Sequence, residues 1–179
     1  MRLRTGLLVA ALGAAAPLQA QVYLAPNVGL AFGGDTNDDS KISYGGTLTF
    51  AGESHVLGFA VDFAYMPDFF AGDLTDNNVT TLMGNLVLIT RGRTRLYTSV
   101  GVGLLKTRVR DAGQFFDINN HELGLNAGVG LLAVPGRFGF QADVRYFRNL
   151  TDPEPDHEFD VDLGSFDYWR GSAGLVIRF

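Results

Sequence analysis

An acidic run near the end of the sequence places carboxylates at every second position. It spans residues 152–162, and its members include Glu154, Asp156, Glu158, Asp160 and Asp162. In an extended chain this spacing gathers the carboxylates on one side, and clustered oxygen ligands suit calcium or magnesium. The run lacks the spacing of an EF-hand, and a charge run is usually a solvated surface. We therefore predict no metal and no cofactor, and keep the five carboxylates as the candidates for a cation site.

The three histidines, His55, His121 and His157, are the candidate bases for acyl-transfer or hydrolytic chemistry. Such a site needs a serine, a histidine and an acid side chain that converge. Only His121 has an acid beside it, Glu122, and adjacent residues of a strand face opposite ways. No serine lies within two residues of it. We predict that the protein is not an enzyme.

A third set of polar residues lies inside otherwise apolar, alternating segments. Its members are Asp62, Asn85, Arg95, Asp143, Arg145, Arg170 and Arg178. We expect a buried polar network in which Asp62 or Asp143 pairs with Arg145, because unpaired buried charge is costly. Counting from the strand ends puts these three near mid-height, Arg95 and Arg178 near one end, and Arg170 near the other. Inward glycines leave room for the long side chains.

Alternation of apolar with small or polar residues predicts the elements that carry this set. The clearest segment, residues 138–147, opposes Phe138 and Val144 on one face to Asp143 and Arg145 on the other. A register slip of one residue would exchange the two faces. Eight candidate strands follow, at residues 22–32, 44–50, 56–66, 80–89, 94–107, 122–133, 138–147 and 168–179.

The connections between these strands alternate in length. They are tight at residues 52–55, 91–93 and 135–137, and long and polar at residues 33–43, 67–78, 108–121 and 148–167. Short turns at one end and long loops at the other are typical of bacterial outer-membrane barrels, whose turns face the periplasm.

The polar face carries too few charges for a water-exposed surface, so we expect the apolar face to point outward into lipid. The alternative is a soluble barrel with an apolar interior. Aromatic residues near the strand ends, at positions 32, 44, 65, 146 and 169 and at positions 50, 138 and 179, predict two interfacial girdles. The predicted fold is all-β, an eight-stranded antiparallel transmembrane up-and-down β-barrel.

The N-terminal segment predicts export. Arg2 and Arg4 precede an apolar run, and Ala20 offers a small residue for cleavage. We assign residues 1–20 to a signal peptide and residues 21–179 to the barrel domain. The chain has 179 residues, no cysteine and a net charge of -5. Removing the two leading arginines makes that charge -7, which disfavours nucleic acid as a partner.

The C-terminal segment places Trp169, Leu175, Ile177 and Phe179 on one face. This pattern resembles the terminal strand by which the barrel-assembly machinery recognises outer-membrane proteins. The chain as a whole resembles the small outer-membrane β-barrel family that includes OmpA-type, OmpX-type and opacity-type barrels. The resemblance implies an integral protein of the Gram-negative outer membrane with membrane lipid, lipopolysaccharide and that machinery as partners. We expect a monomer.

Three functional hypotheses remain at this stage. The first is a non-enzymatic structural or surface-interaction protein that acts through its extracellular loops. The second is a narrow porin-like channel for ions or small solutes, although side chains just fill the interior of an eight-stranded barrel. The third is a lipid A-modifying barrel enzyme, which the histidine positions disfavour.

Overall fold

The computed structural model describes residues 21–36, 40–52, 56–67, 69, 76–110, 117–150 and 167–179. These residues form β1 (Gln21–Phe32), the 3-10 turn η1 (Gly34–Thr36), β2 (Lys41–Ala51), β3 (Leu57–Pro67), β4 (Asp76–Ile89), β5 (Thr94–Arg110), β6 (Asp117–Ala133), β7 (Phe138–Asn149) and β8 (Asp167–Arg178). The predicted signal peptide, residues 1–20, lies outside the described residues. Within the described ranges, no helix is long and apolar enough to cross a bilayer.

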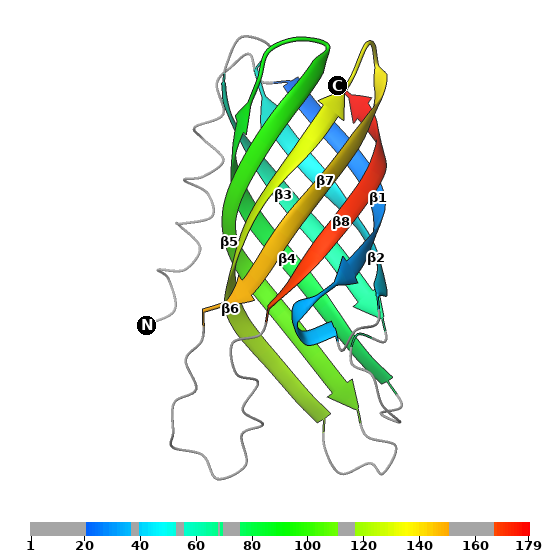
Figure 1. Ribbon diagram of the computed structural model, residues 1–179, viewed down its shortest axis with the longest axis vertical. Helices are drawn as coiled ribbons and strands as arrows, with labels where there is room; N and C mark the ends of the chain where they lie inside the picture. Colours follow the sequence, from blue (N-terminus) through cyan, green and yellow to red (C-terminus); the bar gives the residue numbers. More distant parts are fainter. Residues whose placement is uncertain are drawn as a thin grey trace, which may run out of the picture.

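The strands close into one antiparallel barrel in which each pairs with the next and β1 pairs with β8 (Figure 1). This confirms the predicted up-and-down topology. Following the Cα partners once around the barrel from Arg178 leads to Tyr168, ten residues earlier in the same strand. An offset of this kind tilts the strands against the barrel axis. The tilt brings residues from different strand positions to the same height inside.

The two faces of the barrel wall differ in the way that the alternation predicts. On the outer face, Leu96, Val129 and Leu175 are 60%, 63% and 71% exposed. On the inner face, Asp62 and Arg145 are each 1% exposed. A barrel that lived in water would have the opposite arrangement, because its apolar side chains would fill the interior. The apolar outer face therefore suits contact with hydrocarbon.

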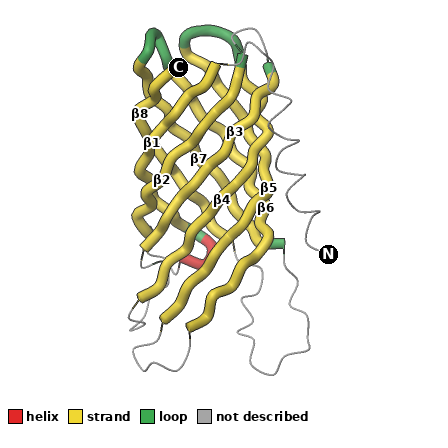
Figure 2. The backbone as a smooth tube through the Cα atoms, turned by 180° about the vertical axis from the view of Figure 1, so that it is seen from behind, coloured by secondary structure: helices red, strands yellow, loops and turns green. Residues whose placement is uncertain are grey.

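The tight connections lie together at one end of the barrel (Figure 2). Residues 90–93 join β4 to β5 and residues 134–137 join β6 to β7. Gly92 has a φ of 122°, which favours glycine in the first of these turns. Parts of the four longer connections lie outside the described residues. We refer below to the turn end and the loop end.

Three neighbouring strands reach further toward the loop end than predicted. β4 begins at Asp76 rather than at residue 80, β5 ends at Arg110 rather than at 107, and β6 begins at Asp117 rather than at 122. Backbone pairing continues to the register Arg110 with Asp117. Each extension holds a single apolar residue among polar ones, at position 79, 109 or 118, so no hydrophobic alternation marks it in the sequence. Backbone pairing does not require such alternation.

The interior has an apolar cluster near each end. The turn-end cluster comprises Tyr23, Ala25, Ala51, Ala60, Val87, Ile89, Tyr97, Leu132 and Val176. The loop-end cluster comprises Ala31, Met66, Phe69, Val79, Met83, Leu105, Phe147 and Tyr168. Along β8, Ser172 and Arg170 lie between the members of the two clusters. A polar layer thus separates the clusters.

Candidate functional site

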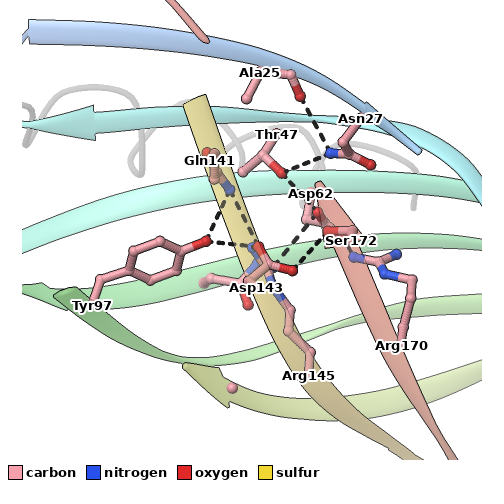
Figure 3. A network of polar contacts seen from close by, with 12 residues as sticks. Ala25, Asn27, Thr47, Asp62, Tyr97, Gln141, Asp143, Arg145, Arg170 and Ser172 are labelled. Atoms are coloured by element: carbon pink, nitrogen blue, oxygen red, sulfur yellow. Dashed lines mark hydrogen bonds and ion pairs between the residues drawn. The ribbon is translucent and has the colours of Figure 1, made fainter. Parts of the chain in front are cut away.

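Four charged side chains from three strands meet in the polar layer (Figure 3). Asp62 comes from β3, Asp143 and Arg145 from β7, and Arg170 from β8. Arg145 Nη2 lies 2.9 Å from Asp143 Oδ2, and its Nη1 lies 3.6 Å from Asp62 Oδ2. Arg170 Nη2 lies 2.5 Å from Asp62 Oδ1. Two carboxylates thus face two guanidinium groups, and the layer carries no net charge.

Neutral groups complete the shell of Asp143. Tyr97 OH donates to Asp143 Oδ2 at 2.7 Å, and Ser172 Oγ donates to Asp143 Oδ1 at 2.8 Å. Gln141 Nε2 donates to Tyr97 OH at 2.9 Å and to Asp143 Oδ2 at 3.2 Å. Figure 3 shows these side chains converging on one carboxylate from β5, β7 and β8. Such partners offset the cost of taking the carboxylate out of water.

Asp62 has a hydroxyl partner of its own. Thr47 Oγ1 donates to Asp62 Oδ2 at 2.9 Å, and Asn27 Nδ2 donates in turn to Thr47 Oγ1 at 3.4 Å. These residues come from β2 and β1, so β1, β2, β3, β5, β7 and β8 all contribute side chains to the network. It therefore ties together strands that do not pair with one another.

Strand register explains why two arginines lie side by side. Arg145 and Arg170 are Cα partners across β7 and β8, which places like charges directly opposite. Asp62 reaches them from β3, where it accepts a hydrogen bond from Arg170 and lies within ion-pair distance of Arg145. The Arg170 guanidinium also lies over the ring of Phe147, 4.8 Å from its centroid. Phe147 stacks on Tyr168 with ring centroids 4.9 Å apart, so the loop-end cluster rests on the network.

Glycines on β6 make space for the long side chains, as the sequence suggested. A Cβ atom on Gly128 would lie 2.5 Å from Arg145 Cγ, and one on Gly130 would lie 2.4 Å from Tyr97 Cζ. Both distances are shorter than carbon atoms tolerate, so any larger residue would displace the arginine or the tyrosine. The network therefore requires glycine at these two inward-facing positions of β6.

Several buried polar atoms of the layer have no hydrogen-bond partner among the described residues. They are Asn85 Oδ1, Ser99 Oγ, both amide atoms of Asn126, Thr81 Oγ1, and the Nε and Nη1 atoms of Arg145 and Arg170. Buried polar atoms without protein partners are normally satisfied by water. We therefore expect the polar layer to be hydrated, while the apolar clusters restrict passage on either side of it.

The seven predicted interior residues divide into three groups. Asp62, Asp143, Arg145 and Arg170 meet in the network, and Arg170 does so although we expected it near the outer end. Strand tilt is the reason, because it brings residue 170 level with Asp62 on β3. Asn85 faces the lumen but its Nδ2 donates to Met83 O instead.

Arg95 and Arg178 lie at the turn end, away from the network, as expected. Arg95 Nη1 donates to Tyr23 OH at 3.2 Å, and Arg178 is partly buried at the end of β8. Sequence reasoning did not assign Tyr97, Gln141 or Ser172 to the network. Their inward position was readable from the alternation, whereas their height relative to Asp143 depends on the barrel offset.

The predicted assembly residues lie on the outer face of β8 and its end. Trp169, Leu175 and Phe179 are exposed, and Ile177 is partly buried. Trp169 packs against Tyr146 of β7 with ring centroids 5.2 Å apart. The face that the sequence predicted is thus displayed on one strand, and its recognition by the assembly machinery stays a prediction.

The candidate cation site lies outside the described residues, as do His55 and His157. His121 falls in β6, in a part whose side chains are not described. Among the described residues, no group of three or more histidine, cysteine, aspartate or glutamate side chains could hold a metal ion. The metal and catalytic hypotheses therefore remain predictions from sequence.

Comparison with known proteins gives a consistent result. A family model described as outer membrane protein beta-barrel domain matches residues 5–166. Among solved structures, Neisserial surface protein A matches with a TM-score of 0.65 at 17% identity, covering 90% of this chain and 97% of that chain. The N-terminal β-barrel domain of OprF from Pseudomonas aeruginosa matches with a TM-score of 0.56 at 15% identity, covering 90% and 98%.

A third similar structure is Ail, the attachment invasion locus protein of Yersinia pestis, in complex with the heparin analogue sucrose octasulfate. It matches with a TM-score of 0.54 at 16% identity, covering 90% of this chain and all of that chain. Identities this low establish a shared fold and nothing further. No curated protein matches the sequence.

Proposed function

Because this chain belongs to the outer membrane protein β-barrel family, and is thus a protein of the outer membrane, we propose that it is a non-enzymatic integral membrane protein that acts through its extracellular loops. The lumen then serves as a structural core. Residues 1–20 direct export and are removed, and the turn end faces the periplasm.

The observation that carries this proposal is the arrangement of the lumen. The ion-paired layer lies between two apolar clusters, the ring of Phe147 lies over the Arg170 guanidinium, and Tyr168 stacks on Phe147. A conducting pore needs a continuous polar path, as in the wide barrels of porins. Moving ions through this lumen would require breaking buried ion pairs and displacing aromatic rings.

Planar-bilayer recording of the refolded mature chain tests the sealed lumen. We expect no unitary current steps above those of the protein-free bilayer. The variant Arg145→Ala is recorded alongside, and we expect it to remain silent because the two clusters are untouched. Reproducible steps from the wild-type protein would contradict the proposal, and steps that appear only in Arg145→Ala would identify a gate and favour the channel hypothesis.

Aromatic residues at the loop end support a contact with the outer leaflet. Trp169 and Tyr146 form a ring pair on the outer face, and Phe32, Tyr44 and Tyr65 are exposed at the same end. Trp and Tyr favour membrane interfaces because their rings are apolar with a polar edge. In this orientation the surrounding lipid is lipopolysaccharide, which is the first partner we propose.

Two similar proteins are named for surface roles, Neisserial surface protein A and the attachment invasion locus protein. These names support a surface-interaction role for the present chain, whose own loops would determine its ligand. Whole-cell binding assays that compare expressing and non-expressing cells on purified surface polymers would test the role. If expressing and non-expressing cells bind every tested polymer equally well, the surface-interaction role is contradicted.

The enzymatic alternative has a separate test. Folded protein is incubated with lipopolysaccharide and phospholipid, and the lipids are analysed by mass spectrometry. We expect unchanged lipid masses. Loss or transfer of an acyl chain that depends on folded protein would contradict the non-enzymatic assignment.

A further inference from the structure

The turn end of the barrel carries a concentration of arginine side chains. Arg91 and Arg93 lie in the turn between β4 and β5, and Arg95 is the second residue of β5. Arg137 lies in the turn between β6 and β7, and Arg178 ends β8. The two turns and their flanking strand ends, residues 87–97 and 131–141, contain no aspartate or glutamate. We call these five residues the arginine rim. Its positive charge contrasts with the net negative charge of the chain.

Backbone hydrogen bonds join the parts of the arginine rim into one arc. Val134 N donates to Arg93 O at 3.1 Å, and Arg178 N donates to Arg137 O at 2.8 Å. Arg95 Nη1 is fixed by Tyr23 OH, and its guanidinium lies 5.9 Å from the centre of the Tyr23 ring. The arc therefore follows neighbouring strands β4 to β8 and rests on rigid elements.

The exposed members of the rim are free to contact other molecules through their side chains. Arg91, Arg93 and Arg137 are exposed. Arg93 and Arg137 contribute to the fold through their carbonyl oxygens. Their guanidinium groups are thus not the atoms that hold the turns together. These three guanidinium groups are therefore available to bind a ligand outside the barrel.

The arginines lie at the depth where the hydrocarbon region ends. Outward-facing Leu88, Leu96 and Phe138 belong to the same strand ends and are 52%, 60% and 68% exposed. Apolar residues of this size contact acyl chains, so the neighbouring arginines fall at the level of the headgroups. If the arginines bound a soluble acidic protein instead, their contact surface would not need a border of exposed apolar residues.

We propose that the arginine rim binds the phosphate groups of anionic phospholipids in the periplasmic leaflet. The planar guanidinium donates paired hydrogen bonds that match phosphate oxygens. Basic residues beside a membrane also attract anionic lipid by charge. The proposal rests on the outer-membrane placement of the barrel and is independent of whether the lumen conducts.

Native mass spectrometry of the folded barrel tests the proposal. The protein is released from detergent with either phosphatidylglycerol or phosphatidylcholine of identical acyl chains. We expect the wild type to retain phosphatidylglycerol preferentially. In the triple variant Arg91→Gln/Arg93→Gln/Arg137→Gln the preference should fall by roughly fivefold for each arginine that contacts phosphate.

Two controls distinguish the effect of the rim arginines on lipid preference from the effects of overall charge and of misfolding. Arg148→Gln removes an exposed arginine from the loop-end part of β7 and should leave the preference unchanged. Heat-modifiable gel migration shows that each variant is folded. Raising the salt concentration should weaken the wild-type preference, because exposed charges are screened. Equal retention of both lipids by the wild type, or an undiminished preference in the folded triple variant, would overturn the proposal.

Discussion

At the scale of single residues, the four buried charges form a chain of alternating sign. Arg170 contacts Asp62, Asp62 contacts Arg145, and Arg145 contacts Asp143. Of the carboxylates in the described part of the chain, Asp62 alone lies within ion-pair distance of both arginines. Each charge depends on its neighbours, because a buried ion pair that loses one partner leaves an uncompensated charge.

Replacing Asp62 should therefore destabilise the barrel strongly. We expect Asp62→Ala to lower the free energy of unfolding by about 3 to 5 kcal/mol, since two arginines lose a counter-charge. Urea unfolding of the protein in lipid vesicles, followed by Trp169 fluorescence, measures the change. Val61→Ala, one residue away on the outer face, should cost roughly 1 kcal/mol. Equal effects of the two variants would mean that the ion pairs contribute little.

The inner surface of β6 offers a second prediction. In Gly128→Ala the new methyl would meet Arg145 Cγ and the backbone oxygen of Val144. We expect a loss of about 1 to 3 kcal/mol from overpacking, measured by the same unfolding assay. Gly136→Ala should change stability by less than about 0.5 kcal/mol, because no atom lies within 4 Å of its new methyl. A neutral Gly128→Ala would show that Arg145 can move aside.

The sequence predicted which residues face the lumen but not which of them touch. Alternation alone places Asp62, Asp143 and Arg145 inward, and the need to pair buried charge suggests a partner for Arg145. The ion pair between Asp62 and Arg170 could not be predicted, because it depends on the ten-residue offset accumulated around the barrel. That offset is set by all eight pairings together.

At the scale of elements, strand existence was predictable and strand length was not. Each predicted strand has its counterpart, including β1, which continues through Pro26. Proline cannot donate a backbone hydrogen bond, and the register between β1 and β8 omits Ala25 and Pro26 while that between β1 and β2 is continuous. The ladder therefore tolerates one local gap. The loop-end extensions of β4, β5 and β6 each hold one apolar residue, which is too few for an alternating pattern, and so they escaped prediction.

The end of β8 allows assembly to be separated from stability. Phe179 and Phe138 lie at the turn end with exposed fractions of 67% and 68%, and both face outward. We expect Phe179→Ser and Phe138→Ser to have similar effects on unfolding in vesicles, about 1 kcal/mol each. In cells, only Phe179→Ser should lower the amount of folded barrel, because only Phe179 belongs to the predicted assembly signal.

Heat-modifiable migration of membrane fractions measures the folded amount in cells. Expression from a titratable promoter keeps synthesis of the two variants equal. If both variants assemble as well as the wild type, or if both fail equally, the terminal phenylalanine is not a specific signal in this protein.

At the scale of the whole molecule, each region of the barrel matches a different surrounding. The outer face meets hydrocarbon, the middle of the lumen holds paired charge between apolar clusters, and the arginine rim lies at the turn end. The same alternation of small or polar with apolar residues creates the first two regions. Closing the sheet gives each described strand a partner on both sides, so the backbone pairs within the wall except at the local gap beside Pro26, as a membrane requires.

Whether the outer face of the barrel contacts lipid can be tested by placing an arginine at two depths on that face. Val129 lies near the middle of the outward-facing apolar part of β6, residues 123–133, beside Val144, whereas Leu96 lies two residues from the start of β5, and the two are almost equally exposed. In a lipid-embedded barrel, Val129→Arg should cost about 2 to 4 kcal/mol and Leu96→Arg about 0 to 1 kcal/mol, because the penalty falls toward the interface. In a water-exposed barrel neither substitution would matter. Unfolding of both variants in vesicles therefore distinguishes the two environments, and a negligible cost for Val129→Arg would mean that this face does not contact hydrocarbon.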